Sequence, residues 1–342
     1  AIAGVPAPAP GPGASDANPA TNCNIDSFEL FTAVAEKGVN EAMAQSPPPA
    51  EIRSKHAVLF MPSAALAATA PLRVAAAAFA SLPRKMKAGQ SLTAFTKFVV
   101  VGHGETAAEP VGVSLGEDVC GGPGFADKEA VRFLRTKVKR KLGALGPRLL
   151  NCRLEPGTCP EPSAPSVEQP MPFIAAISNH SLVGNIVPIM MQSQSPHLGV
   201  ALGDALSMLT ASGGAWEAER VLFVFGGDLS TGLKTEQAKL CDSHTMDTVT
   251  GQGVPQVVRY FADLWAGKIM KGDCTKLALP RSYASLLAAA RVASTLGMKQ
   301  SRYEVVSKVP PPELVPQDEG APTDRVIGFG TLLFWKDEGL PG

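Results

Sequence analysis

The sequence predicts an α/β fold, with a mixed, mostly parallel sheet and helices on both of its faces. Two observations predict this class. From residue 56 onward, short apolar runs bounded by turn residues alternate with amphipathic stretches. The apolar runs are continuous rather than alternating, which is typical of strands that are buried on both faces. The chain has 342 residues, of which 45% are hydrophobic, so it can bury one large core or two smaller ones.

The predicted elements follow one another along the chain. Apolar runs predict strands over residues 57–61, 98–102, 185–191, 221–226 and 326–335. The stretches between them predict helices over residues 71–81, 127–142, 199–211, 254–270 and 281–296. Two Pro-rich segments, 155–165 and 309–322, are expected to be surface loops. This alternation favours a sheet with helices on both faces.

The N-terminal region differs from the rest of the chain in composition. Residues 1–22 are mostly Ala, Pro and Gly, whereas the apolar spacing over 25–43 predicts a short amphipathic helix that starts at Asp26 or Ser27. We therefore divide the chain into a Pro/Ala-rich extended arm, residues 1–54, and an α/β domain, residues 55–342. Because such an arm lacks a core of its own, we expect a neighbouring subunit to hold it.

Charge and hydropathy limit the function classes. The chain carries 31 basic and 31 acidic residues, a net charge of zero, which argues against a DNA-binding protein. No apolar run is long enough to span a bilayer, so we predict no transmembrane segment. The chain begins at Ala1 rather than Met, so we expect a removed transit peptide. Together with the Ala-rich composition, this predicts a mitochondrial protein, on the matrix side or peripheral to the inner membrane.

Six cysteines are present, with no Cys-x-x-Cys pair. The chain is too long to need a disulfide framework, so mostly reduced thiols are expected. Cys152 and Cys159 are the pair closest in sequence, and their disulfide state stays open. Cys274 is expected to be mainly a small apolar filler.

Five short motifs lie at the ends of predicted elements. They are residues 61–65 (Met-Pro-Ser-Ala-Ala), 101–106 (Val-Gly-His-Gly-Glu-Thr), 166–173 (Ser-Val-Glu-Gln-Pro-Met-Pro-Phe), 225–231 (Phe-Gly-Gly-Asp-Leu-Ser-Thr) and 326–330 (Val-Ile-Gly-Phe-Gly). In order and spacing they resemble the Memo-like family, which is related in fold to the class III extradiol ring-cleaving dioxygenases. The resemblance covers roughly residues 55 to 335. It implies a site at one edge of the sheet, where imidazoles at strand ends hold a metal.

The residues that stand at the family's histidine positions are not histidines here. They are Ser63, Glu105, Thr106, Pro165 and Thr231. We therefore predict a pseudoenzyme with no catalytic residue, no metal and no cofactor. Its vestigial pocket is expected to contain Ser63, His103, Glu105, Thr106, Asp228, Thr231 and Cys274. Asp228 follows two glycines and is expected to cap the turn after its strand.

Two alternatives stay open. One is a metal-dependent oxidoreductase of the extradiol type, with iron or another divalent metal in a rearranged site around Asp228, Glu105, His103 and Cys274. The other is a small-molecule or lipid-binding module that keeps the pocket. Histidine and carboxylate side chains are the ligands that would serve the first alternative.

One strongly basic segment stands out. Residues 128–141 contain seven basic residues and one acid, with an apolar stripe at helical spacing, which predicts an amphipathic helix with a basic face. Such a face is commonly only solvated. The functional alternatives are docking on an acidic protein surface, contact with anionic lipid headgroups, or contact with RNA.

These observations lead to one functional hypothesis. The chain is expected to be a non-catalytic accessory subunit of a larger mitochondrial complex, with an ATP synthase or a respiratory complex favoured and a mitochondrial ribosome as the other host. Its partners would be other protein subunits. The docking candidates are Phe28, Phe31, Arg132, Arg135, Lys139 and Arg140.

Overall fold

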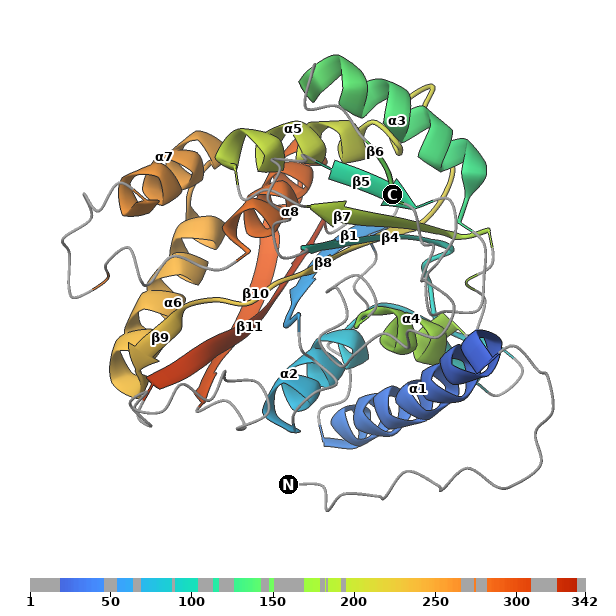
Figure 1. Ribbon diagram of the computed structural model, residues 1–342, viewed down its shortest axis with the longest axis horizontal. Helices are drawn as coiled ribbons and strands as arrows, with labels where there is room; N and C mark the ends of the chain where they lie inside the picture. The colour runs from blue at the N-terminus through green and yellow to red at the C-terminus, as the bar shows by residue number, and fades with distance from the viewer. Residues whose placement is uncertain are drawn as a thin grey trace, which may run out of the picture.

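The computed structural model describes residues 19–45, 54–63, 69–87, 90–103, 113–116, 126–142, 148–150, 169–178, 182, 184–191, 195–265, 274, 282–308 and 325–336. Within these ranges the chain forms a nine-stranded mixed sheet with helices on both faces (Figure 1). The predicted α/β class is therefore confirmed.

The sheet has a parallel centre. In spatial order, its central strands are β1 (His56–Met61), β8 (Val221–Gly226), β4 (Lys97–His103) and β7 (Ile186–Met191). The strands outside this centre are β11 (Arg325–Trp335), β10 (Gln300–Lys308), β9 (Thr231–Lys234), β5 (Val113–Gly116) and β6 (Arg148–Leu150). β11 is antiparallel to β1, β10 and β9, whereas β5 is antiparallel to β7 and parallel to β6. A separate hairpin consists of β2 (Arg84–Lys87) and β3 (Gln90–Thr93).

The central strands are buried on both faces, as their continuous apolar runs predict. In β1, Val58 and Phe60 point into one hydrophobic core, whereas Leu59 and Met61 point into a second core on the opposite face. The predicted bounds of these strands agree with the structure to within one residue. The last predicted strand, 326–335, is also present, as β11.

The helices divide between the two faces of the sheet (Figure 1). The core that contains Phe60 is covered by α3 (Lys128–Leu142), α5 (Pro196–Ser207), α6 (Thr235–Gly251), α7 (Val254–Trp265) and α8 (Tyr283–Thr295). The core that contains Leu59 is covered by α1 (Pro19–Gln45), α2 (Thr69–Ala80) and α4 (Met171–Ser178). The predicted 199–211 helix begins earlier, as α5, because Pro196 suits the first turn of a helix.

The N-terminal helix is longer than predicted and packs on the domain itself. Ala35 and Val39 of α1 are buried in the same core as Phe79 and Phe173. A Cβ atom at Gly38 would lie only 3.3 Å from the Cβ of Ala76 in α2, so the two helices approach closely there. Residues 19–45 thus belong to the helical layer rather than to an arm that only a neighbouring subunit could hold. Residues 1–18 lie outside the described part of the chain.

Several elements were not predicted. They are the β2–β3 hairpin, β5, β6, β9, β10, α4 and α6. The two segments expected to be surface loops, 155–165 and 309–322, lie outside the described residues. No helix within the described ranges has the length and apolar character needed to span a bilayer.

Candidate functional site

The carboxyl ends of three parallel strands meet at one edge of the sheet. Ser63 lies two residues beyond β1, His103 is the last residue of β4, and Asp228 lies two residues beyond β8. Ser282, which immediately precedes α8, joins them at this edge. The structure therefore brings together three of the residues predicted for the vestigial pocket.

Ser63 and Asp228 form the first contact of this edge network. The Ser63 N–H donates to Oδ1 of Asp228 at 3.1 Å, and the Ser63 hydroxyl donates to Oδ2 at 2.6 Å. Both carboxylate oxygens thus accept a hydrogen bond from the same serine. Only 7% of Asp228 is exposed, so the contact is largely withdrawn from solvent. The prediction that Asp228 caps the turn after its own strand is wrong, because its carboxylate bonds to Ser63 in the loop after β1.

Ser282 continues the network to His103. Its Oγ accepts the backbone N–H of Asp228 at 3.3 Å and lies 3.0 Å from Nδ1 of His103. Ser282 is fully buried. A Cβ atom at position 227 would lie 2.5 Å from the Ser282 Cβ and 2.7 Å from the Phe60 ring, so the glycine there permits this close approach. The edge network, Ser63–Asp228–Ser282–His103, thus links β1, β8, β4 and α8.

Asp242 of α6 fixes the next part of the same loop. Its Oδ1 accepts the N–H of Ser230 at 2.9 Å, and Asp242 is fully buried. A Cβ atom at Gly328 would lie 1.8 Å from Oδ2 of Asp242, so any larger residue would collide with the carboxylate. A Cβ atom at Gly330 would lie 2.7 Å from Leu229. The last motif of the sequence, residues 326–330, therefore contains two glycines whose lack of a side chain leaves room for Asp242 and Leu229.

The remaining predicted pocket residues do not join the edge network in the described part of the chain. Thr231 begins β9 and pairs with Ile327 of β11. Glu105 and Thr106 lie outside the described residues, as do Cys152 and Cys159. Sequence reasoning missed Ser282, which precedes α8, and Asp242, which lies within α6, because neither residue follows a predicted strand.

Cys274 is not a pocket residue. It forms a disulfide with Cys241 of α6, with the two Cα atoms 5.5 Å apart. Both cysteines are buried in a small cluster that also contains Leu233, Ala238 and Val326. The expectation of reduced thiols is thus wrong for this pair, because tertiary packing brings together cysteines that are 33 residues apart. Cys274 packs in a buried apolar cluster, as expected, but it does so as one half of a disulfide.

The donor groups of the edge network do not fit a redox metal held by several imidazoles. The network offers one imidazole, one carboxylate and two hydroxyls, and the carboxylate already accepts from Ser63. Within the described ranges, no three His, Cys, Asp or Glu side chains are grouped as metal ligands. The edge network therefore joins the loops after β1 and β8 to the start of α8 through hydrogen bonds among its own residues.

The basic helix α3 is a second candidate site. Its buried stripe consists of Ala130, Val131, Leu134 and Val138. On the exposed side lie Arg132, Arg135, Lys139 and Arg140. In Figure 1, α3 lies at the rim of the molecule, beyond β5 and β6. The predicted amphipathic helix is therefore confirmed, and these four basic residues face outward.

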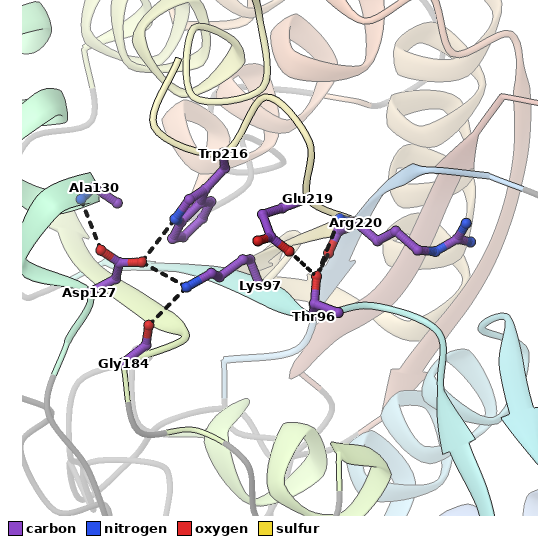
Figure 2. Close-up of polar contacts among 8 residues, drawn as sticks. All are labelled: Thr96, Lys97, Asp127, Ala130, Gly184, Trp216, Glu219 and Arg220. Carbon is purple, nitrogen blue, oxygen red and sulfur yellow. Dashed lines mark hydrogen bonds and ion pairs between the residues drawn. The ribbon is translucent and has the colours of Figure 1, made fainter. Parts of the chain in front are cut away.

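Asp127 fixes the start of α3 (Figure 2). Its Oδ1 accepts the Ala130 N–H at 3.0 Å, as an N-cap does. Its Oδ2 accepts from the Lys97 ammonium and from the Trp216 indole, both at 2.9 Å. Partial burial acts to raise the pKa of Asp127, but the Ala130 N–H, Lys97 and Trp216 outweigh it and lower the pKa. Lys97 also donates to the Gly184 carbonyl at 3.0 Å, which joins the helix start to β4 and β7.

The apolar docking candidates lie on α1. Phe31 is 42% exposed and its neighbour Leu30 is 64% exposed. The side chain of Phe28 lies outside the described part of the structure.

Comparison with known proteins assigned no family to the chain. No protein-family model matches it, and no curated protein matches it.

Proposed function

We propose that this chain is a non-catalytic subunit of a larger mitochondrial assembly, and that it docks on an acidic partner surface through the outward face of α3. One observation carries the proposal. Arg132, Arg135, Lys139 and Arg140 lie on the exposed side of a helix that is firmly anchored by its buried stripe and by Asp127. We call these four residues the α3 basic face.

The charges of the α3 basic face are not compensated within the described part of the chain. None of the four side chains forms an ion pair there. Like charges on one helix face repel one another, and a complementary acidic surface would relieve this repulsion. Such a face also speeds association with an oppositely charged partner. The positive charge of these four residues, on a helix held by its buried stripe and by Asp127, suits a docking surface.

The edge network supports a structural role for the former ligand positions. On the Memo-like reading, Ser63 stands where a histidine would hold a metal, and here it donates two hydrogen bonds to Asp228. His103 contacts Ser282. These groups stabilise the sheet edge by bonding to one another, which favours a pseudoenzyme over an oxidoreductase.

The disulfide bears on the location that we propose. Disulfides persist where thiols are kept oxidised and are rare in reducing compartments. Because Cys241 and Cys274 are bonded, we expect the subunit on the outer, oxidising side of the inner membrane rather than on its matrix side. An ATP synthase or a respiratory complex remains the favoured host.

Native affinity purification from mitochondria tests the proposal. The variant replaces all four residues of the α3 basic face by Gln. The matched control replaces Lys37, Lys239, Arg259 and Lys299 by Gln, which removes the same charge from exposed positions elsewhere. We expect the control to co-purify with the assembly in wild-type proportion and the basic-face variant to be lost from it. Stoichiometric co-purification of the basic-face variant would overturn the proposal.

A further inference from the structure

β10 forms an open edge of the large sheet. It pairs antiparallel with β11 along its whole length, from Gln300 opposite Trp335 to Lys308 opposite Ile327. Within the described residues no strand pairs with its other side, so β10 ends the sheet there (Figure 1). In the same part of the chain, its backbone groups bond to β11 alone. The unpaired backbone groups of such an edge can bond to a strand of another chain.

The side chains of β10 alternate between the two faces of the sheet. Tyr303 and Val305 pack on the core that contains Phe60. Arg302 and Glu304 therefore lie on the opposite face, and both are exposed. The strand thus presents one positive and one negative side chain, two residues apart, on a single face of the open edge.

The backbone of β1 shows which groups of β10 face outward. The Met61 carbonyl accepts the Gly227 N–H, so residues of β1 on the Met61 face turn their backbone groups toward β8. β10 runs in the same direction as β1, because both strands are antiparallel to β11. Arg302 and Glu304 lie on the Met61 face, so their backbone groups turn toward β11 in the same way. Accordingly, the Glu304 carbonyl oxygen lies 3.3 Å from the Cβ position of Gly330 in β11.

The alternate residues Ser301, Tyr303 and Val305 therefore turn their backbone N–H and C=O groups to the open side. We propose that β10 pairs antiparallel with β10 of a second copy of this chain, about a two-fold axis at Tyr303. Tyr303 then exchanges backbone hydrogen bonds with its own copy, and Ser301 exchanges them with Val305. The two sheets become one continuous sheet, and the same surface serves both copies, as a two-fold interface requires.

Charge complementarity identifies a second copy as the occupant. Neither Arg302 nor Glu304 forms an ion pair within the described residues. With the axis at Tyr303, Arg302 of each copy lies directly opposite Glu304 of the other, and opposite charges in this position are stabilising. If the axis moves by one residue, Arg302 faces Arg302 or Glu304 faces Glu304, which is destabilising. The strand is thus complementary to itself in this register.

This contact is independent of the α3 basic face. β10 lies at one end of the strand order, whereas α3 lies beyond β5 and β6, which are at the other end (Figure 1). A dimer formed through β10 therefore carries two α3 basic faces, one on each copy.

Sedimentation velocity of the intact chain over a range of concentrations tests the pairing. We expect a dimer that dissociates on dilution. Arg302→Glu and Glu304→Arg should each weaken dimerisation at least about tenfold, because each places two pairs of like charges across the axis. The double variant restores opposite charges in reversed order and should dimerise as the wild type does. Arg259→Glu, which reverses an exposed charge on α7, is the matched control and should not change dimerisation.

A second pair of variants tests the backbone bonds. Ser301→Pro removes an N–H that faces the open side and leaves the bonds to β11 in place, as proline does at a sheet edge. Ser301→Ala keeps this N–H and is the matched control. We expect Ser301→Pro to be monomeric and Ser301→Ala to dimerise, with a circular dichroism melt to confirm that both fold. If Ser301→Pro does not fold, the charge-reversal variants carry the test.

Three results would overturn the proposal. The first is a wild type that stays monomeric at every concentration. The second is a double charge reversal that dimerises no better than Arg302→Glu alone. The third is a folded Ser301→Pro variant that dimerises as well as Ser301→Ala. A monomeric wild type whose Arg302→Glu variant is lost from the native assembly would assign the open edge to a strand of a different subunit instead.

Discussion

Ser63 donates both its backbone N–H and its hydroxyl to Asp228, at 3.1 and 2.6 Å, across 165 residues of sequence. A carboxylate that accepts two hydrogen bonds from one residue holds that residue's backbone and side chain at the same time. The loop after β1 is thereby tied to the loop after β8 at the carboxyl edge of the sheet. Asp228 is also joined through its N–H to Ser282 and so to α8. The edge network is a cross-link between elements that are distant in the chain.

Replacing Asp228 should therefore cost stability. Asp228→Ala leaves the Ser63 N–H and hydroxyl without their acceptor in a largely buried place, which costs about 2–3 kcal/mol. Urea denaturation measures the change in the free energy of unfolding. The control is Asp263→Ala, which removes a carboxylate from a surface pair with Arg259 and should change stability by about 0.5 kcal/mol or less. If Asp228→Ala keeps wild-type stability, the carboxylate is not held for structural reasons, and a functional role would have to be considered.

The sequence predicts the centre of this fold well because burial on both faces leaves a plain signal. The runs 57–61 and 221–226 become β1 and β8 almost without change. β10, which pairs with β11, was missed because it contains polar and charged residues such as Arg302 and Glu304 and so has no continuous apolar run. α6 was missed because it buries Asp242, Thr245 and Thr248, and polar residues on a buried face hide helical periodicity.

The candidate site was predictable only in part, for a related reason. Ser63, His103 and Asp228 follow strands, and parallel strands bring their carboxyl ends to one edge, so their proximity can be predicted from sequence. Ser282 reaches the same edge from the start of a helix, and the Cys241–Cys274 bond depends on how α6 packs. Strand register likewise brings His56 and Lys336 together. Such contacts follow from tertiary packing, which local sequence patterns do not specify.

The packing of α1 on the domain predicts opposite results for neighbouring substitutions. Val39 is 3% exposed and faces the core, whereas Asn40 is exposed. Val39→Asp places an unpaired carboxylate among apolar side chains and should cost about 3 kcal/mol or more. Asn40→Asp, which introduces the same group on the outer face, should leave the thermal transition almost unchanged. Equal melting curves for the two variants would mean that α1 is not part of the core.

Truncation extends this prediction. Removal of residues 1–18 leaves α1 complete, whereas removal of residues 1–45 uncovers the apolar surface of α2 and α4. We expect the short truncation to unfold at the same temperature as the full chain, and the long one to aggregate or melt at a lower temperature. Analytical size exclusion and circular dichroism distinguish these outcomes. A well-folded, monomeric product of the long truncation would restore the division at residue 54.

Asp127 should make the stability of the chain depend on acid pH. Its pKa is lowered in the folded state, so its stabilising effect is complete above the unfolded value of about 3.9 and is lost as the pH falls through the folded pKa. Asp127→Asn should lower stability by about 2 kcal/mol at pH 7. The difference between variant and wild type should shrink below about pH 4. Urea denaturation at pH 7, 5 and 3 measures it, and a difference that does not change with pH would contradict the assigned ion pair.

A double-mutant cycle with Lys97→Met isolates the pair itself. The Lys97 ammonium lies 2.9 Å from Asp127, and both side chains are mostly buried. The two single variants should each destabilise the protein, and the double variant should lose less than their sum by about 1 kcal/mol. Strict additivity would assign the effect of Asp127 to the Ala130 and Trp216 contacts alone.

The disulfide predicts a measurable loss of free thiols and a redox-dependent stability. Unfolded, unreduced protein should yield two fewer titratable thiols than reduced protein on account of Cys241 and Cys274, and a digest should contain their linked peptides. Because the bond closes a loop of 33 residues, the chain-entropy argument gives about 3–4 kcal/mol of stabilisation. Reduction, or replacement of both cysteines by Ala, should therefore lower the urea midpoint markedly. The double Ala variant should then be insensitive to reductant at this site. If reductant shifts the midpoint of the wild type and of that variant equally, some other bond carries the effect, and the buried cluster around Leu233 owes its stability to packing alone.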